Sequence, residues 1–203
     1  MASKIGIANV GLQAIGGSTI TSFSQGTKNA NVVNDIYDEL RRNLLAYAWN
    51  FATNRVELGR STTVPAYQFK YAYVLPSDWI YTVSVHENDQ GAGTTFYKSE
   101  QVGDQTVLLS DSENLYLRYV KDEGDPNLMP ADFRYALSMA LARDMTIPIS
   151  NSVALYDKFE GVARKALIKA KATDAQGSFP ESRPRGSWAN SRGGLQGNST
   201  FRS

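Results

Sequence analysis

The sequence contains no cysteine among its 203 residues. Without a thiol the chain forms no disulfide of its own, offers no thiolate ligand to a metal and has no cysteine nucleophile or redox switch. A chain of this length buries enough apolar surface to fold without such cross-links. We therefore expect one domain, or one domain with a long appendage, that is stabilised by packing.

Histidine is almost as scarce, because His86 is the only one. A lone histidine at the end of a predicted strand does not combine with a serine or cysteine motif into a catalytic triad, so we interpret it as structural. Carboxylate pairs occur at Asp122 and Glu123 and at Asp35 and Asp38. The first pair falls in a predicted loop and the second on the polar face of a helix, so we interpret both as solvated charge. The sequence thus predicts no enzymatic activity, no cofactor and no metal.

Long hydrophobic runs and an excess of charge of either sign are lacking as well. The 21 basic and 20 acidic side chains leave a formal net charge of +1, which excludes a basic surface covering the whole chain. No stretch approaches the length of a membrane span, and Asn9 and Gln13 interrupt the apolar residues near the N-terminus, which makes it a poor signal peptide. We expect synthesis in the cytoplasm, no membrane contact, and at most a local contact with nucleic acid.

The first quarter of the chain has the period of amphipathic helices. A short helix is predicted from Ile5 to Ile15, where Gly16 and Gly17 end it. A longer helix begins near Thr27. Its apolar stripe comprises Val33, Ile36, Tyr37, Leu40, Leu44 and Ala48, and its polar face comprises Asn34, Asp35, Asp38, Arg41 and Arg42. The aromatic residues at 47–51 are expected to cap the core where the chain leaves this helix.

The middle of the chain changes to the two-residue period of β-strands. We expect strands at 67–74, 80–86, 94–101, 105–109 and 114–120, with tight turns at 75–79 and 102–104. A loop from Glu87 to Gly93 joins the second of these strands to the third. The short connections predict that neighbouring strands are antiparallel.

Residues 129–171 return to the helical period and predict two consecutive helices. Pro130 suits the first position of one helix, Ile147 and Pro148 end it, and Ser150 or Asn151 can cap the next. The predicted fold is therefore α+β, a four-helix bundle with an inserted antiparallel β-domain and an extended C-terminal arm. We expect N-terminal helices of the bundle at 1–52, the β-domain at 53–125, C-terminal helices of the bundle at 126–173 and the arm at 174–203.

The arm is the segment whose composition most clearly indicates a partner. Its apolar residues are too few to offset the entropy of ordering, so we expect disorder until it binds. Arginine and aromatic side chains dominate buried anchors at protein interfaces, and they also stack on and pair with nucleic acid. The expected anchors are Phe179, Arg183, Arg185, Trp188, Arg192, Phe201 and Arg202. A solubilising tail without a binding role is the alternative.

Four short motifs indicate a family resemblance. They are AWNFA at 48–52, PAYQF at 65–69, LPSDW at 75–79 and MPADFRYAL at 129–137. In this order, and followed by an alanine-rich last helix, they resemble the tail tubular protein A family of short-tailed bacteriophages over about residues 5–173. The loop at 87–93 and the segment beyond Ala175 have no counterpart in the resemblance.

The resemblance implies a structural role in a virion. Proteins of that family are head-to-tail adaptors, so it implies a homo-oligomeric ring, expected to be dodecameric, between the portal protein and the tail nozzle protein. It also implies that the C-terminal arm reaches the portal and that genomic DNA passes through the ring without specific binding. We further expect the loop residues Glu87, Asn88, Asp89 and Gln90 to contact a neighbouring subunit or the tail. Such a protein would be assembled in the host cytoplasm and located at the head-tail junction.

Two other functions stay open at this point. A nucleic-acid-binding accessory protein would contact DNA or RNA through the arginines and aromatics of the arm, with an affinity that falls steeply as salt rises. A virion-borne cell-wall hydrolase would need a convergent acid/base pair, which the sequence does not indicate.

Overall fold

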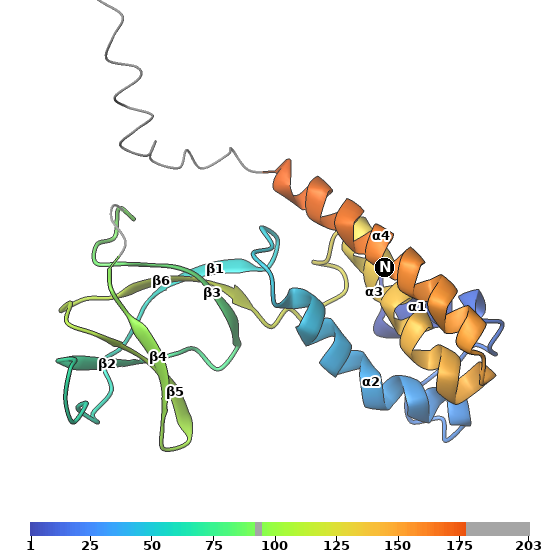
Figure 1. The fold of residues 1–203 in the computed structure, drawn as a ribbon, viewed down its shortest axis with the longest axis horizontal. Helices are drawn as coiled ribbons and strands as arrows, with labels where there is room; N and C mark the ends of the chain where they lie inside the picture. The colour runs from blue at the N-terminus through green and yellow to red at the C-terminus, as the bar shows by residue number, and fades with distance from the viewer. Residues whose placement is uncertain (92–94, 178–203) are drawn as a thin grey trace, which may run out of the picture.

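The computed structural model describes residues 1–91 and 95–177, and it is mixed α+β as the sequence predicts (Figure 1). All the expected anchors of the arm, from Phe179 to Arg202, lie outside the described residues. The helices are α1 (Lys4–Ala14), α2 (Lys28–Leu45), α3 (Ala131–Met145) and α4 (Val153–Ala175). The strands are β1 (Thr53–Glu57), β2 (Tyr71–Val74), β3 (Trp79–His86), β4 (Lys98–Val102), β5 (Gln105–Ser110) and β6 (Tyr116–Lys121).

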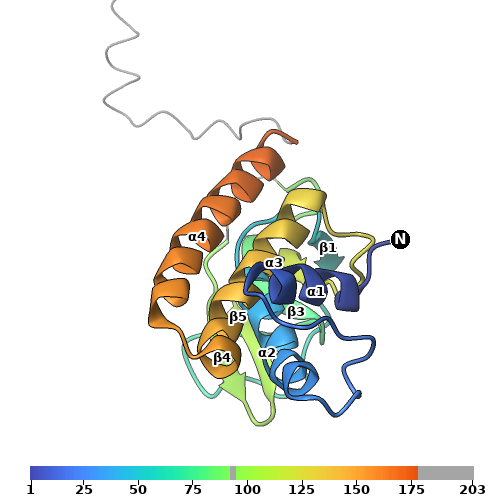
Figure 2. The same cartoon turned by 90° about the vertical axis from the view of Figure 1, so that its right-hand side faces the viewer.

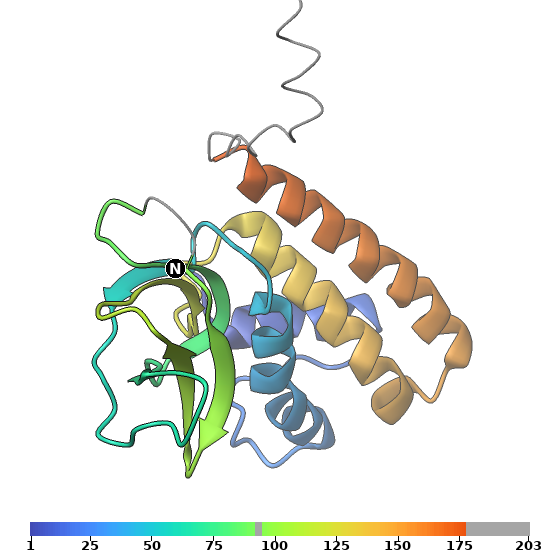
Figure 3. The same ribbon diagram turned by 60° about the vertical axis from the view of Figure 1, so that its left-hand side comes forward.

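Helix α3 is the central element of the helical layer. It packs against α1, α2 and α4, and it lies between α4 on one side and α2 on the other (Figure 3). The view turned by 90° shows α4 on one side of α3 and α1 packed across another side of it (Figure 2). Its apolar residues Phe133, Ala136, Leu137, Ala140, Leu141 and Met145 are buried, and so are Ser138, Met139 and Ala142 from the remaining faces. Neighbours on several sides, rather than a single apolar stripe, therefore explain its burial.

Small residues bring α1 and α3 into close contact. A Cβ atom at Gly11 would lie 2.8 Å from the backbone oxygen of Ser138 and 3.0 Å from Cε of Met145. The hydroxyl of Ser138, itself buried, donates a hydrogen bond to the backbone oxygen of Ile7 at 3.0 Å. Glycine is thus required at position 11 because any side chain would push the two helices apart.

The aromatic residues after α2 close one end of the helical core, as predicted. Trp49 is 1% exposed, and its ring contacts those of Phe51 and Phe133 with centroids 5.7 and 5.0 Å apart. Its indole N–H donates to the backbone oxygen of Leu44 at 2.8 Å. The chain therefore leaves α2 along a fixed path into β1.

The six strands form two antiparallel sheets of three. Their orders are β1-β6-β3 and β2-β5-β4, so β6 and β5 are the central strands. Tyr73, Leu108 and Leu117, which come from both sheets, share one hydrophobic cluster. On β5 the neighbours of Leu108 point to the other face of the second sheet, where Val107 and Leu109 join a smaller cluster around Phe69. The antiparallel pairing is confirmed, although only β4 and β5 are joined as consecutive strands.

Several predicted boundaries are wrong for local reasons. The strand expected at 67–74 starts only at Tyr71, because Gln68 has a positive φ of 73° that interrupts extended backbone. Strand β1 was not predicted. The helix expected to have Ser150 or Asn151 as its cap is capped by Ser152 instead. Residues 146–150 form a wide π-helical turn, and Asn151 ends that turn in the left-handed region. The finer description as a four-helix bundle with an inserted domain stays a prediction.

Candidate functional surfaces

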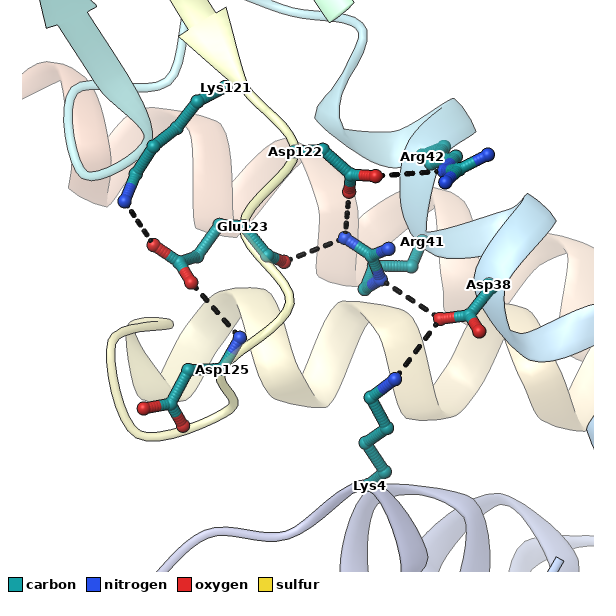
Figure 4. Close-up of polar contacts among 8 residues, drawn as sticks. All are labelled: Lys4, Asp38, Arg41, Arg42, Lys121, Asp122, Glu123 and Asp125. Atoms are coloured by element: carbon teal, nitrogen blue, oxygen red, sulfur yellow. Dashed lines mark hydrogen bonds and ion pairs between the residues drawn. The ribbon is translucent and has the colours of Figure 1, made fainter. Parts of the chain in front are cut away.

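A network of charged side chains joins α2 to the linker between β6 and α3 (Figure 4). Arg41 was predicted on the solvated face of α2, and this is wrong because the residue is only 4% exposed. Its guanidinium donates to the carboxylate of Asp122, to the backbone oxygen of Glu123 at 2.7 Å and to Asp38 at 3.4 Å. Asp38 also pairs with Lys4 of α1 at 3.3 Å. Burial of this arginine is tolerated because three acceptors surround it.

The carboxylates of the linker complete this network. Glu123 is buried, pairs with Lys121 at 2.8 Å and accepts a hydrogen bond from the backbone nitrogen of Asp125 at 3.0 Å. Asp122 also accepts from Arg42 at 2.9 Å. The interpretation of Asp122 and Glu123 as solvated charge is therefore wrong.

The electrostatics of the network follow from these contacts. Burial by itself would raise the pKa of Asp122, but the hydrogen bonds and positive charges of Arg41 and Arg42 outweigh burial and lower it. The hydrogen bond with Glu123 raises the pKa of Lys121. Each carboxylate in the network is engaged by a cation or a backbone N–H. The arrangement therefore holds the helices to the linker and offers no free acid/base pair.

Glu87, the first residue of the predicted contact loop, is held against its own chain. Its carboxylate accepts hydrogen bonds from the hydroxyls of Thr95 at 2.6 Å and Ser112 at 3.0 Å. These two bonds, the one from Thr95 first, lower the pKa of Glu87. The loop is thus anchored at Glu87, which leaves the residues after it to make any contact with a partner.

A cavity of about 590 Å³ lies beside the same loop. Asn88, Asp89 and Gln90 line one side and are exposed, while Arg55 and His86 come from the β1-β6-β3 sheet. His86 lies 2.9 Å from the hydroxyl of Ser84 through its Nε2 atom. The structure thus brings the loop and the histidine together, and the role of the loop as a contact with a neighbour or the tail stays a prediction.

Three exposed apolar residues, Val64, Tyr67 and Phe96, lie around the buried Phe69 beside the β2-β5-β4 sheet. We call these four residues the aromatic patch. The rings of Phe69 and Phe96 stack with centroids 5.8 Å apart, yet Phe96 is 75% exposed and Tyr67 is 81% exposed. A cavity of about 310 Å³ lies under this segment. The patch could not be predicted from the sequence, because Phe96 lies 27 residues after Phe69 and only the fold brings the two rings together.

The outer side of α4 carries the basic residues Lys158, Arg164 and Lys165, which we call the basic face of α4. All three are exposed, and none forms an ion pair within residues 1–91 and 95–177. Ile168, one turn beyond Arg164, is 60% exposed. This face was not singled out from the sequence, because the nearly balanced total charge hides it.

The C-terminal end of α4 is fixed to the turn after α2. The carboxylate of Asp174 accepts from the backbone nitrogen of Asn50 at 2.8 Å, and the side chain of Asn50 donates to the backbone oxygen of Asp174 at 2.7 Å. One turn earlier, Lys171 lies 3.9 Å from the centre of the Tyr47 ring. The helix is thus held until its last turn, close to the point where the predicted arm begins.

Two more features of the described residues concern metal binding and membrane insertion. In residues 1–91 and 95–177 no group of three or more His, Asp or Glu side chains is placed to hold a metal ion. None of the helices in this part of the chain is both long and apolar enough to cross a bilayer.

No family model matches the sequence, and no curated protein matches it either. The resemblance to tail tubular protein A therefore stays a hypothesis drawn from the four motifs.

Proposed function

We propose that this chain is a structural virion protein, the subunit of a ring-forming adaptor that joins a phage portal to the tail nozzle. In this proposal the helices form a bundle that carries the two sheets as an inserted β-domain, and the arm binds the portal. The ring is a homo-oligomer, with twelve subunits as the expected number, and genomic DNA passes through it without specific binding. The protein acts by binding and performs no catalysis.

The observation that carries this proposal is the aromatic patch. Phe96 and Tyr67 expose most of their surface to water. The β2-β5-β4 sheet beside them lies at the end of the molecule opposite α4 (Figure 1). Contiguous exposed aromatic side chains are typical of protein-binding sites, where they act as buried anchors. We assign the tail nozzle protein as the partner of this patch, because the arm and the helices then remain for the portal and for neighbouring copies.

Co-assembly with a purified portal ring and a purified nozzle protein tests the proposal. The full chain should form a complex of higher mass with the portal, and that complex should capture the nozzle protein. The variant Tyr67→Ser/Phe96→Ser should still join the portal but lose at least tenfold in affinity for the nozzle. A matched control, Tyr81→Ser, removes a 45% exposed aromatic from β3 and should leave both interactions intact. A chain that ignored the portal would contradict the adaptor proposal.

A nucleic-acid-binding accessory role is the second candidate, and the basic face of α4 favours it. Lys158, Arg164 and Lys165 are free to contact phosphates, in addition to the arginines expected in the arm. Binding of a fluorescent DNA duplex separates the two functions. An accessory protein should bind it with an affinity that falls steeply between 50 and 200 mM salt, whereas the adaptor should show no such binding.

A further inference from the structure

We propose that neighbouring copies of this chain join through α2 of one copy and α4 of the next, an acidic helix face against a basic one. The inference rests on the proposed function as a ring subunit and names the two surfaces that form the ring. Each subunit of a ring must expose two different patches that complement each other, because its contacts are head-to-tail.

The first patch is the outer face of α2. Asp35 and Glu39 are exposed on it, and neither forms an ion pair with any residue that the structure describes. Asp38 beside them is already matched by Lys4 and Arg41. The other exposed side chains on this side of α2 are the neutral Asn31 and Asn34, Arg42, which pairs with Asp122, and Lys28, two turns before Asp35. Two unmatched carboxylates against the single unmatched cation Lys28 leave this face with a net negative charge.

The second patch is the basic face of α4. Glu160 is paired with Arg143 at 3.1 Å, and Lys169 with Asp132 at 3.0 Å, so these charges are already compensated. Asp157 is the one other acid on the outer side of this helix. It stands against Lys158, Arg164 and Lys165, none of which forms an ion pair in the described chain. The face is therefore positively charged.

The two patches do not meet within one molecule. Helices α2 and α4 flank α3 on opposite sides (Figure 3). A second copy that offers its α2 to the α4 of the first leaves its own α4 open to a third. Such a contact repeats in one direction, and it closes into a ring when the rotation between copies permits.

Gly161 lies at the centre of the basic face, three and four residues before Arg164 and Lys165. A Cβ atom at this position would meet nothing within 4 Å, so packing inside the chain does not require glycine. Glycine weakens a helix, so its presence where the chain itself needs no space points to a contact outside the chain. Its missing side chain lets the backbone of a neighbouring helix approach, and the contact would then cover Ile168, which is 60% exposed.

Charge reversal of each face tests the contact. Sedimentation velocity of the full chain at low salt should show self-association that weakens as salt rises, because screening acts on exposed charges. The variants Asp35→Lys/Glu39→Lys and Arg164→Glu/Lys165→Glu should each associate at least tenfold more weakly. A control variant, Asp104→Lys/Glu113→Lys, makes the same charge change as the first on the sheets and should associate as the natural sequence does.

Mixing the two reversed variants gives the decisive result. One variant then carries two acidic faces and the other two basic faces, so an equimolar mixture should recover association in alternating order. Loss of binding without recovery in the mixture would overturn the proposal, as would reversed variants that associate normally. A natural sequence that stays monomeric at low salt would overturn it as well.

Two further measurements separate this inference from the adaptor function. Gly161→Gln should leave the fold intact and weaken self-association at least tenfold, and an unchanged association would contradict a close approach at this position. Portal binding by the monomeric variants reports on the adaptor function by itself. If Arg164→Glu/Lys165→Glu abolished DNA binding and left self-association unchanged, the basic face would be a nucleic-acid site instead.

Discussion

The helical layer and the two sheets differ in how completely they are packed. All four helices contribute to one large hydrophobic cluster, and its central helix α3 has neighbours on several sides. The sheets divide their apolar residues between two smaller clusters, and the outer one leaves Phe96 and Tyr67 exposed. Helix α3 packs against three other helices, whereas β2, β4 and β5 make their main contacts with one another, so side chains beside this sheet stay exposed.

The difference also extends to the surfaces that each region offers. The helices expose charge on the outer sides of α2 and α4, whereas the second sheet exposes aromatic rings. Charged faces suit contacts between identical copies that must assemble in a fixed orientation, and aromatic anchors suit a dedicated partner. The difference in packing between the two regions should appear in the free energy of unfolding of variants, independently of any partner.

Removal of a core aromatic should have the largest effect. Phe133→Ala removes the ring that packs against Trp49 and Phe51, and it should lower the free energy of unfolding by about 3–5 kcal/mol. Phe96→Ala in the aromatic patch should cost less than about 1 kcal/mol, because Phe96 is largely exposed in the folded state. Urea unfolding followed by tryptophan fluorescence measures both. Equal costs would show that the two regions are packed alike.

Removal of the buried Arg41, which joins α2 to the linker between β6 and α3, should have the next largest effect on the free energy of unfolding. Arg41→Ala leaves Asp122 without its closest cation and should cost about 2–4 kcal/mol, somewhat reduced because Asp122 is still 20% exposed. Arg42→Ala is the matched control. Arg42 is 59% exposed and its loss should cost under about 1 kcal/mol. A double-mutant cycle with Asp122→Asn would reveal no coupling if the arginine merely filled space.

Two glycines on different helices should respond in opposite directions. Gly11→Ala forces a methyl group against the backbone of Ser138 and should cost about 1–3 kcal/mol. Gly161→Ala meets open space and should stabilise the chain by about 0.5–1 kcal/mol through helix propensity. Thermal unfolding of the two variants at low protein concentration provides the test. A loss of stability at both positions would mean that α4 is packed more tightly than its open surface indicates.

Acid should weaken the contacts of Asp122 with Arg41 and Arg42 in a defined pH range. The folded-state pKa of Asp122 is lowered, so its contribution is complete above the ordinary aspartate pKa of about 3.9 and is lost as pH falls from there through the lowered value. Asp132 and Glu87 also have lowered pKa values and add to the same trend. The specific expectation is that Asp122→Asn makes stability less dependent on pH between about 5 and 2. Identical pH profiles would assign the trend to the other carboxylates.

Local patterns in the sequence were sufficient for part of the fold. The period of α2 predicted its buried Val33 and Tyr37, and the two helices predicted within residues 129–171 are α3 and α4. Strand β1 was missed because its residues, TNRVE, carry little apolar signal and are held by pairing with β6. The burial of Arg41 was missed because the partner that compensates its charge, Asp122, lies 81 residues away in the sequence.

Composition and periodicity by themselves determined the mixed α+β class, the order of the main elements and the absence of thiol chemistry. Only the tertiary structure decided that α3 is central, that α2 and α4 lie on opposite sides of it, and that the exposed Phe96 stacks on the buried Phe69. The reason is that a repeating pattern reports which side of an element is apolar. Which element covers that side, and which charges meet across the chain, depends on contacts between residues far apart in the sequence.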